Sequence, residues 1–378
     1  MGGGVIGLSA AWCCAARGLD VALVDPEPGR GASWAAAGML APVSEVRYGE
    51  EPLLALNLAS ARRWPAFAQR LAEAAGQSVG YRRCGTLVVA VDDDDRRHAE
   101  ELVGFQRELG LEVEWLTGRR ARDLERAVAP GVRAGIWVPG DHQVHNRMVL
   151  GALREAAVRA GVDVIGRRAV AITIDAGAVR GVELDRGEAL HAPVVVLAAG
   201  CWSADVAGLP AQALPAIRPV KGQIIRLAPT ERAPKVGRTV RGIVQGASVY
   251  VVPRADGSVV VGATVEEQGF DNSVTAGGLY ELLRDAHRVV PGITEMSVTE
   301  TAAGLRPGSP DNAPVVGAVD PKRASGLVVA AGHYRNGFLL APVTAAAVVA
   351  LVVGDEPPPE VAPFGPERFV AAPARAGG

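Results

Sequence analysis

The chain has 378 residues, which is long enough for two domains or for one large α/β domain with an insertion. Hydrophobic residues make up 49% and charged residues 21% of the chain, the balance of an ordinary soluble globular protein. The formal net charge of −2 gives no reason to expect a nucleic acid or an anionic membrane as a partner. The cysteines show neither a CxxC pair nor metal-like clustering, so we expect free thiols in a reducing cytoplasm and no bound metal.

The first glycines match a dinucleotide-binding loop. Gly2, Gly4 and Gly7 fit G-x-G-x-x-G, in which the glycines allow a tight turn, a close approach to a pyrophosphate and close packing of the next helix. Asp25 ends the next apolar run, VALVD, where its carboxylate can accept hydrogen bonds from ribose hydroxyls. A plain turn and a strand-end aspartate are the alternative interpretations. The two features together favour the dinucleotide loop.

A strand is expected in front of this loop, because such a unit begins with the central strand of its sheet. A central strand pairs on both sides, and its absence would leave two rows of unpaired backbone groups in a hydrophobic core. We therefore predict that the natural chain extends several residues upstream of Met1 and that the first strand is missing from this sequence. An intact mass equal to that of residues 1–378 would contradict the prediction.

Two kinds of strand alternate along the chain. The continuous apolar runs VVVLAAG (194–200) and GLVVAAG (326–332) are typical of a parallel sheet covered on both faces. Shorter runs, SVYVVPR (248–254) and SVVVGAT (258–264) among them, indicate a mixed or antiparallel sheet, with a hairpin loop at 255–257. The predicted fold is α/β, with a discontinuous cofactor-binding domain and a second, α+β domain for the substrate. The predicted division is 1–80, 141–210 and 300–378 for the cofactor domain, and 81–140 and 211–299 for the substrate domain.

Two stretches allow a second interpretation. The acidic run 92–95 resembles a metal site, but consecutive aspartates before a helical segment more often cap the helix. The apolar stretch 338–353 falls short of the ~20 residues that a membrane-spanning helix needs, and it contains a proline. We expect a helix cap in the first case and a buried helix, with no membrane contact, in the second.

Three further blocks give the chain a family resemblance: GASWAAAGMLAP (31–42), GLRPGSPDNAPVVG (304–317) and AAGHYRNGFLLAPVTA (330–345). With them the sequence resembles the FAD-dependent glycine oxidases of thiamin biosynthesis, in the wider group of D-amino acid and sarcosine oxidases. The resemblance covers essentially the whole chain and implies a Rossmann-like FAD-binding domain. It also implies non-covalent FAD, because covalent sarcosine oxidases use a C-terminal cysteine and the last cysteine here is Cys201.

The resemblance also implies which positions contact FAD. The glycine turn would meet the pyrophosphate, residues 25–26 the adenosine ribose, residues 37–39 the flavin ring and residues 333–339 its pyrimidine edge. A helix beginning near Ala341 would direct its positive end at the negative charge of the reduced ring. A plain turn before a hydrophobic helix is the alternative interpretation of 333–339. The implied contacts are Gly2, Gly4, Val5, Ile6, Gly7, Asp25, Pro26, Ala32, Ser33, Ala37, Gly38, Met39, Val170, His333, Tyr334, Arg335, Asn336, Gly337, Phe338 and Leu339.

By the same resemblance the substrate is bound through arginine. Arg306, in GLRPG, would form a forked pair with the substrate carboxylate, for which a guanidinium is well shaped. Arg335 and Tyr250 would line the same pocket. Val265 stands where some relatives have a longer side chain, so the choice among glycine, sarcosine and small D-amino acids stays open.

The implied reaction is oxidative deamination of a small amino acid with O2, giving an imine and then glyoxylate, ammonia and hydrogen peroxide. The imine would serve thiazole formation in the cytoplasm, and relatives of this kind form tetramers, so a homo-oligomer is expected. The alternatives are a sarcosine or D-amino acid oxidase, a dehydrogenase that passes electrons to quinone, and a non-catalytic FAD-binding homologue. Retention of Tyr250, Arg306 and Arg335 argues against the last.

Overall fold

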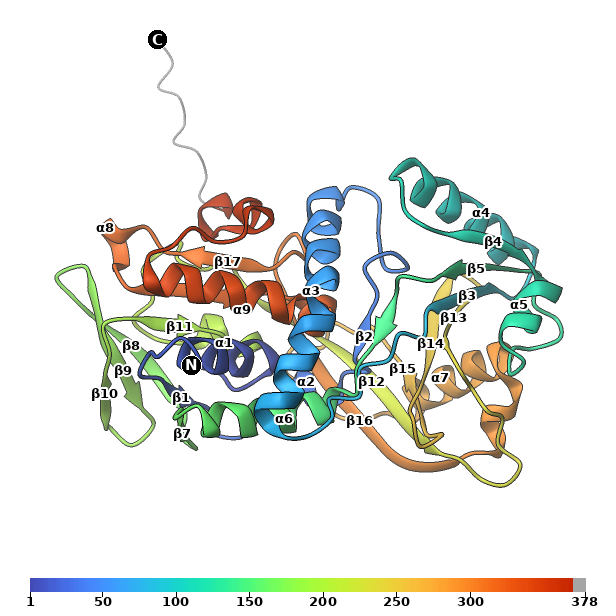
Figure 1. The fold of residues 1–378 in the computed structure, drawn as a ribbon, viewed down its shortest axis with the longest axis horizontal. Helices are drawn as coiled ribbons and strands as arrows, with labels where there is room; N and C mark the ends of the chain where they lie inside the picture. Colours follow the sequence, from blue (N-terminus) through green and yellow to red (C-terminus); the bar gives the residue numbers. More distant parts are fainter. Residues whose placement is uncertain (370–378) are drawn as a thin grey trace, which may run out of the picture.

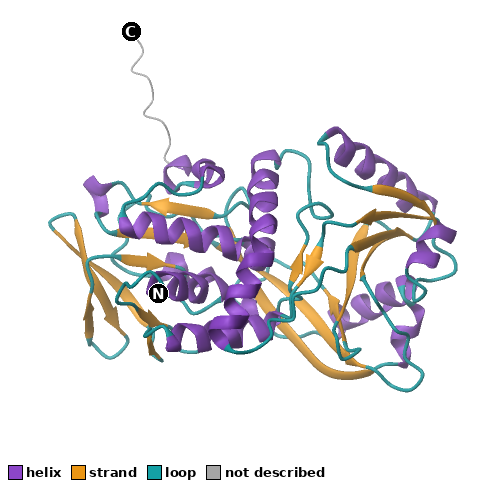
Figure 2. Ribbon diagram, viewed as in Figure 1, coloured by secondary structure: helices purple, strands orange, loops and turns teal. Residues whose placement is uncertain are grey.

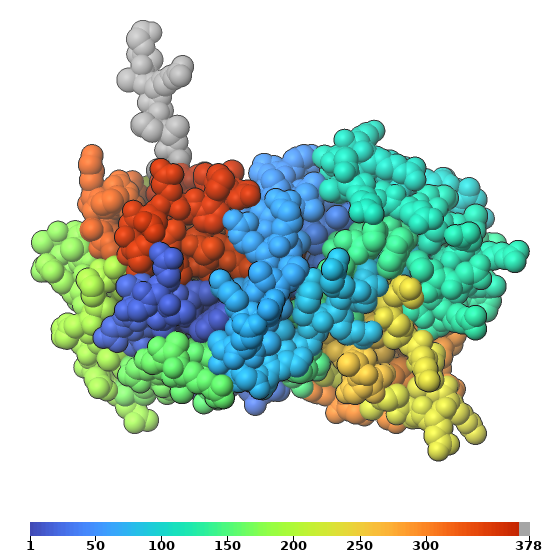
Figure 3. Space-filling model, in the orientation of Figure 1, coloured from blue at the N-terminus to red at the C-terminus, as the bar shows by residue number. Residues whose placement is uncertain are grey.

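The structure is a computed structural model, and it describes residues 1–369. The molecule is elongated and has two halves, with the long helix α3 (Glu51–Ala75) crossing the middle of the view (Figure 1). One half contains Met1 and several short sheets, and the other is organised around one large sheet (Figure 2). In the space-filling view α3 lies between the C-terminal helices and the segment that follows it (Figure 3).

Short parallel strands form the centre of the first half. Strand β1 (Ala22–Val24) pairs in parallel with β7 (Asp163–Ile165), and β11 (Val195–Leu197) pairs in parallel with β18 (Leu327–Ala331). Strand β17 (Val315–Ala318) adds an antiparallel edge to β18. Every residue of β18 is buried, and this burial and the parallel pairing confirm the expectation from the continuous apolar runs.

The first two residues of the chain lie between these strand pairs. The amide of Gly2 donates to the carbonyl of Val24 at 2.9 Å, and the amide of Ala198 donates to the carbonyl of Met1 at 2.9 Å. The backbone thus connects β1 on one side with β11 on the other before it enters the glycine turn. Helix α1 (Val5–Ala15) begins directly after that turn.

The sequence predicts a helix that begins near Ala341, and this prediction is wrong by one turn. Helix α9 (Gly337–Val353) begins at Gly337. A proline follows Ala341, and prolines favour the first turn of a helix, which is why the later start is expected. In the structure two side chains of α3 support the extra turn. Ser60 Oγ and Trp64 Nε1 donate to the carbonyl of Leu339 at 2.6 and 3.0 Å, which satisfies a carbonyl near the proline.

Helix α9 is also the one segment among residues 1–369 that could cross a membrane by length and composition, counted as Tyr334–Val353. Its apolar window is 61% buried inside the protein, and it packs against α1 and α3. A helix covered in this way belongs to the core, as the sequence predicts for this stretch.

The second half is built on an eight-stranded mixed sheet with the order β16-β12-β15-β14-β13-β3-β5-β4. All neighbouring strands are antiparallel except β13 and β3, which run in parallel, so the mixed sheet predicted from the sequence is confirmed. The strands are β3 (Thr86–Ala90), β4 (Glu114–Thr117), β5 (Ala134–Val138), β12 (Arg218–Ala228), β13 (Thr239–Val244), β14 (Ala247–Pro253), β15 (Val259–Gly262) and β16 (Ser297–Gly308).

Two local predictions in this half, a hairpin loop and a helix cap, are confirmed. The predicted hairpin at 255–257 joins β14 to β15. The acidic run caps helix α4 (Asp93–Glu108), because Asp92 Oδ1 accepts from the amides of Asp94 and Asp95 at 3.0 and 2.9 Å. The cap explains the aspartates without a metal.

Strand β16 spans the predicted domain boundary at residues 299 and 300 and pairs with β12 along its length. The assignment of residues 300–308 to the cofactor domain therefore stays a prediction, as does the rest of the division. All four cysteines are free, as the sequence predicts. The remaining elements are α2 (Ala32–Ala35), β2 (Met39–Leu40), α5 (Gly118–Leu124), β6 (His142–Gln143), α6 (Asn146–Arg159), β8 (Ala169–Asp175), β9 (Ala178–Leu184), β10 (Ala189–His191), η1 (Gly200–Asp205), α7 (Ala276–Val289), η2 (Pro291–Glu295), α8 (Pro321–Ala324), η3 (Tyr334–Asn336), η4 (Pro359–Phe364) and η5 (Pro366–Phe369).

Candidate active site

A cavity of about 690 Å³ extends from the glycine turn to the large sheet. Its walls come from the turn, residues 30–39, the carboxyl ends of β11 and β18, and the facing parts of β12, β14 and β16. Ligands of open α/β sheets bind at the carboxyl ends of the strands, which is where this cavity lies. The predicted residues that line it are Gly2, Gly4, Val5, Ile6, Asp25, Pro26, Ala32, Ser33, Ala37, Gly38, Met39, Val170, Tyr250, Arg306, His333, Tyr334, Arg335, Gly337 and Phe338.

Three predicted residues lie outside the cavity lining. Gly7 faces the turn, where a Cβ would stand 1.8 Å from the carbonyl oxygen of Gly2. Asn336 is 3% exposed and precedes α9, and Leu339 is a core residue of that helix. Gly7 thus permits the turn, and Asn336 and Leu339 help to position α9. The remaining predicted residues border the cavity.

The glycine turn and the first residues of α1 border the cavity. Gly2 has a φ of +94°, and a Cβ there would stand 2.3 Å from the carbonyl oxygen of Ala198, so glycine is required. Ser33 Oγ accepts from the amide of Val5 at 3.0 Å and ties the turn to the segment 32–39. The start of α1 therefore points into the cavity, the geometry that favours an anionic pyrophosphate.

Asp25 holds the loop at the far end of this wall. Its Oδ2 accepts from the amide of Gly3 at 2.6 Å and its Oδ1 from the amide of Glu27 at 2.8 Å. Each carboxylate oxygen has two acceptor positions, so the carboxylate keeps capacity for ribose hydroxyls after these bonds. Glu27, which also lines the cavity, was not singled out by the sequence analysis.

A buried arginine supports the segment 37–39. Arg254, only 6% exposed, donates from Nη2 to the carbonyl of Ala37 at 2.7 Å and from Nη1 to that of Val144 at 3.0 Å. Burial, with Arg226 nearby, lowers the pKa of Arg254 to about 9. Gly38 is required beside it, because its φ is +74° and a Cβ would stand 2.3 Å from the carbonyl oxygen of Val144. Arg254 could not be predicted from the sequence, because its partners lie far away along the chain.

On the opposite wall His333 is a buried neutral imidazole. It is 3% exposed, its Nε2 is 3.0 Å from Thr344 Oγ1, and burial lowers its pKa to about 3. A group with this pKa is too weak a base to take a proton from a bound substrate. His333 therefore borders the cavity as a hydrogen-bonding group and not as a general base.

Arg306 and Tyr250 meet at the sheet end of the cavity by crossing two glycines. Arg306 on β16 passes over Gly222 of β12, where a Cβ would stand 2.3 Å from its Nη2. Tyr250 on β14 passes over Gly262 of β15, where a Cβ would stand 2.4 Å from the phenol oxygen. In the strand order β16-β12-β15-β14 the two side chains therefore approach each other from opposite sides.

Both groups keep hydrogen-bonding capacity toward the cavity. Arg306 Nη1 donates to the carbonyls of Thr264 and Lys221 at 3.1 and 3.3 Å, while no hydrogen bond within residues 1–369 uses its Nη2. Burial raises the pKa of Tyr250 against the opposing charge of Arg306, so the phenol stays protonated and can donate. A cation and a phenol at one end of a cavity suit a carboxylate ligand.

Arg335 lines the same cavity and uses one guanidinium nitrogen for an ion pair, while its buried Nε and Nη1 have no partner among residues 1–369. Its Nη2 lies 2.5 Å from Glu50 Oε2 and also donates to the carbonyl of Glu45 at 3.4 Å. Glu45, another lining residue that the sequence analysis missed, pairs with Arg241. Burial alone would raise the pKa of Glu45, but Arg241 and Arg335 outweigh it and lower the pKa. The charge of Arg335 is therefore balanced, unlike that of Arg306.

Two valines differ in their relation to the cavity. Val170, one of the implied FAD contacts, lines it and is 37% exposed. Val265, expected at the substrate end, is 67% exposed and lies outside the lining. The wall nearest Arg306 is formed instead by Gly222, Ile224 and Gly304. These three residues were not among those predicted for the site.

The cavity fits FAD in shape and chemistry. Helix amides and glycines form one end, a carboxylate lies beyond them, and residues 35–38 form a wall of small side chains in the middle. The amino terminus of α9 faces the same space through Gly337. These features suit, in turn, a pyrophosphate, a ribose and a flat ring that becomes negatively charged on reduction. Residues 198–202, which follow β11, also line the cavity. The glycine at the end of the run VVVLAAG is the sequence feature that could have indicated them.

Comparisons with known proteins agree with this fit. Residues 1–351 match the family described as FAD dependent oxidoreductase. Glycine oxidase from Geobacillus kaustophilus is 35% identical over 374 residues, which cover 98% of this chain and 96% of that protein. A crystal structure of glycine oxidase from Geobacillus kaustophilus matches with a TM-score of 0.89 at 34% identity and covers 97% of each chain.

Two further relatives have other names. Hydrogen cyanide synthase subunit HcnC from Pseudomonas aeruginosa is 30% identical over 99% of this chain and 96% of its own. Bifunctional protein ThiO/ThiG from Trichormus variabilis is 32% identical over 98% of this chain, but the chain spans only 54% of that protein. The similarity thus extends over the whole of this chain in each case, while the names of the relatives differ.

Proposed function

Since the chain belongs to the FAD-dependent oxidoreductase family, with FAD as its cofactor, we propose that it oxidises glycine or a similarly small amino acid with O2. The observation that carries the proposal is the pair Arg306 and Tyr250, placed over two glycines at one end of the FAD-sized cavity. The identity of 35% with a glycine oxidase along the full chain supports the substrate class.

In this proposal Arg306 binds the substrate carboxylate. Its Nη1 is occupied by two carbonyls, which leaves Nη2 and Nε to donate two roughly parallel bonds. The protonated phenol of Tyr250 donates a further bond from the other side. Binding at three donors fixes the direction of the Cα–H bond, and this orientation supplies a large part of the catalysis. FAD, when held at this site, would supply a two-electron acceptor that O2 reoxidises.

We further propose that no side chain removes the amine proton. His333 has a pKa of about 3 because it is buried, and Tyr250 has a raised pKa, so neither accepts a proton near neutral pH. The substrate therefore binds with its amine already neutral. It leaves as an imine, which hydrolyses to glyoxylate and ammonia while O2 is reduced to hydrogen peroxide.

The relatives' names support two candidate places for this reaction in metabolism. The ThiO/ThiG protein supports a role in forming the thiazole of thiamin. The name of the HcnC relative supports a second candidate, in which the product is hydrogen cyanide. Peroxide with glyoxylate as products supports the first function, and cyanide supports the second.

The assembly and the location are proposed separately. Four free thiols fit a reducing cytoplasm. Strand β4 lies at the edge of the large sheet, where it offers unpaired backbone groups to a second copy. We propose a cytoplasmic homo-oligomer, such as a tetramer, and light scattering of the purified protein measures its mass.

The function is tested by recording the flavin spectrum without oxygen, before and after adding glycine. Reduction of the flavin by glycine is expected, and reduction by sarcosine or D-alanine alone would move the substrate without changing the chemistry. Arg306→Ala removes one partner of a buried charge pair, which costs about 2–5 kcal/mol, so KM for glycine should rise at least ~30-fold with FAD still bound. An unchanged KM would refute the carboxylate role.

A further inference from the structure

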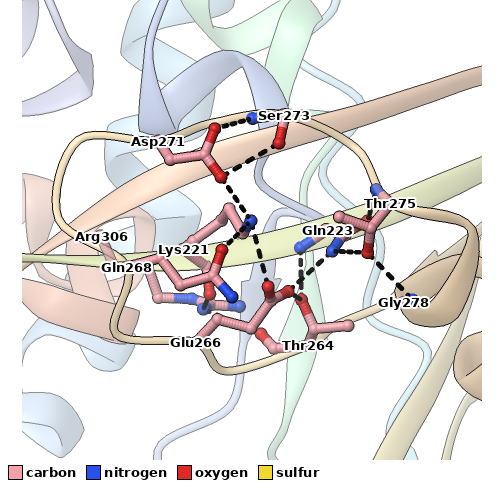
Figure 4. A network of polar contacts seen from close by, with 10 residues as sticks. All are labelled: Lys221, Gln223, Thr264, Glu266, Gln268, Asp271, Ser273, Thr275, Gly278 and Arg306. Carbon is pink, nitrogen blue, oxygen red and sulfur yellow. Dashed lines mark hydrogen bonds and ion pairs between the residues drawn. The ribbon is translucent and has the colours of Figure 1, made fainter.

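A fully buried lysine lies behind Arg306. Lys221, on β12, has a side chain with 0% exposure. Its ammonium contacts Gln268 Oε1 at 2.7 Å, Glu266 Oε2 at 3.1 Å and Asp271 Oδ2 at 3.2 Å (Figure 4). Three acceptors match the three N–H donors of a lysine. The group is thus fully paired although it has no contact with water.

All three acceptors belong to one segment, residues 264–275, which we call the strap. The strap follows β15 and leads into α7. Lys221 and Glu266 exchange backbone hydrogen bonds at 2.8 and 3.0 Å, and Gln223 binds the strap near both ends. The amide of Gln223 donates to Thr264 Oγ1, and its Oε1 accepts from the amide of Thr275, both at 2.8 Å. The strap is therefore attached to β12 at its two ends and in its middle (Figure 4).

Glu266 connects this attachment with Arg306. One carboxylate oxygen of Glu266 lies 3.1 Å from Lys221 Nζ, and the other accepts from Thr264 Oγ1 at 2.6 Å. Thr264 in turn presents its carbonyl to Arg306 Nη1 at 3.1 Å. The second acceptor of that nitrogen is the carbonyl of Lys221 itself, at 3.3 Å. Both carbonyls that orient the guanidinium thus belong to residues of the lysine network.

The network depends on the charge of the lysine. Burial alone would lower the pKa of Lys221, but Glu266 and Asp271 outweigh it and raise the pKa above its ordinary value. Glu266 is the more enclosed partner, with 20% of its side chain exposed against 49% for Asp271. Removing the ammonium would leave the Glu266 carboxylate without its cation, and such groups move toward water. The strap and the Thr264 carbonyl would move with it.

We propose that Lys221 is a positioning residue for the substrate carboxylate. Through Glu266 it fixes the Thr264 carbonyl, which holds Arg306 Nη1 and leaves the other donors of the guanidinium free for the ligand. The inference rests on the proposed role of Arg306 in binding the carboxylate. Lys221 itself does not line the cavity, so it acts on ligand affinity through Arg306 and not by contact.

The test is a double-mutant cycle on the FAD-containing full chain, with acetate as a carboxylate ligand that cannot be oxidised as an amine. Acetate binding is followed by the change in flavin absorbance for wild type, Lys221→Met, Arg306→Ala and the double variant. We expect Lys221→Met to weaken acetate binding about tenfold, or about 1.4 kcal/mol, when Arg306 is present. In the Arg306→Ala background the same change should have less than about twofold effect, because the residue it acts through is gone.

The outcomes separate the inference from the proposed function. If Arg306→Ala leaves acetate binding unchanged, the proposed carboxylate role fails. If Arg306→Ala weakens binding but Lys221→Met does not, or weakens it equally in both backgrounds, the positioning inference fails alone. With glycine as substrate, Lys221→Met should raise KM about tenfold and change kcat less than about threefold. A loss confined to kcat would also overturn the inference.

Two further variants protect the test against misfolding. Glu266→Gln keeps the shape of the connecting side chain and removes its charge, and its own cycle with Arg306→Ala decides the question if Lys221→Met loses FAD. Glu125→Gln is the matched control, because Glu125 is 4% exposed and holds the amides of Gly237 and Arg238 in the same half of the molecule. This control lies outside the cavity lining and should leave acetate binding within about twofold.

Discussion

The two ends of the cavity are built by different means. At the cofactor end the cavity is bordered by the backbone of the glycine turn and the start of α1, and the residues that permit this backbone are glycines such as Gly2 and Gly7. At the substrate end the groups are side chains, Arg306 and Tyr250, that lie across strands of the large sheet. The first arrangement depends on neighbours in sequence, and the second depends on which strands are paired.

This difference predicts how each end fails. A change in the glycine turn should abolish cofactor binding, because no side chain there can substitute for the backbone. A change at the substrate end should leave FAD bound. It should lower the affinity for the amino acid by a limited factor, since several groups bind the same ligand.

The largest effect is expected for Gly7→Ala. Its Cβ would stand 1.8 Å from the carbonyl oxygen of Gly2, which is backbone that cannot move aside. We expect purified Gly7→Ala protein to lack the visible flavin spectrum and to take up no FAD when titrated. Gly104→Ala is the control, because nothing lies within 4 Å of a Cβ there, and it should keep a full complement of FAD. Normal FAD content in Gly7→Ala would contradict the assignment of the turn.

A smaller effect is expected for Gly222→Ala, which places a Cβ 2.3 Å from Arg306 Nη2. The guanidinium is the end of a flexible side chain, so it should shift and not unfold the sheet. We expect KM for glycine to rise about tenfold, the cost of about one charge-assisted hydrogen bond, with FAD content unchanged. Gly277→Ala, in α7 of the same half with nothing within 4 Å of its Cβ, should leave KM unchanged.

Equal KM values for Gly222→Ala and Gly277→Ala would show that Arg306 does not bind the substrate from its position over Gly222. Loss of FAD in Gly222→Ala would be equally informative, because it would mean that the two ends of the cavity are not independent.

The same contrast explains what the sequence could predict. The glycine turn and the helix cap at Asp92 are made by residues close in sequence, so their spacing is visible without a structure. The glycine under Arg306 is visible only once β12 is known to pair with β16, and the glycine under Tyr250 only once β15 is known to pair with β14. Before that they are ordinary glycines in strands.

Long-range polar contacts were the least predictable part of the site. Arg254 holds the carbonyl of Ala37, a residue 217 positions away, and two of the three acceptors of Lys221 lie 47 and 50 positions away. Arg335 was expected to face the substrate, and the ion pair with Glu50 that balances its charge joins residues 285 positions apart. Sequence spacing carries no information about such pairs, because the fold alone brings them together.

The smallest effect is expected for His333→Asn, in the dependence of the reaction on pH. Burial lowers the pKa of His333 to about 3, so the imidazole is neutral throughout the range from pH 5 to about 9. The rise of kcat/KM with pH should therefore follow deprotonation of the substrate amine, and asparagine at this position should not move it, whatever the absolute rate. The profile should shift instead with the amine, when glycine is replaced by an amino acid of different amine pKa. Two results would contradict this prediction: loss of the inflection in His333→Asn, or a pH profile that does not change with the pKa of the substrate amine. Either result would show that a protein group takes the proton, so that the substrate end does more than bind and orient the amino acid.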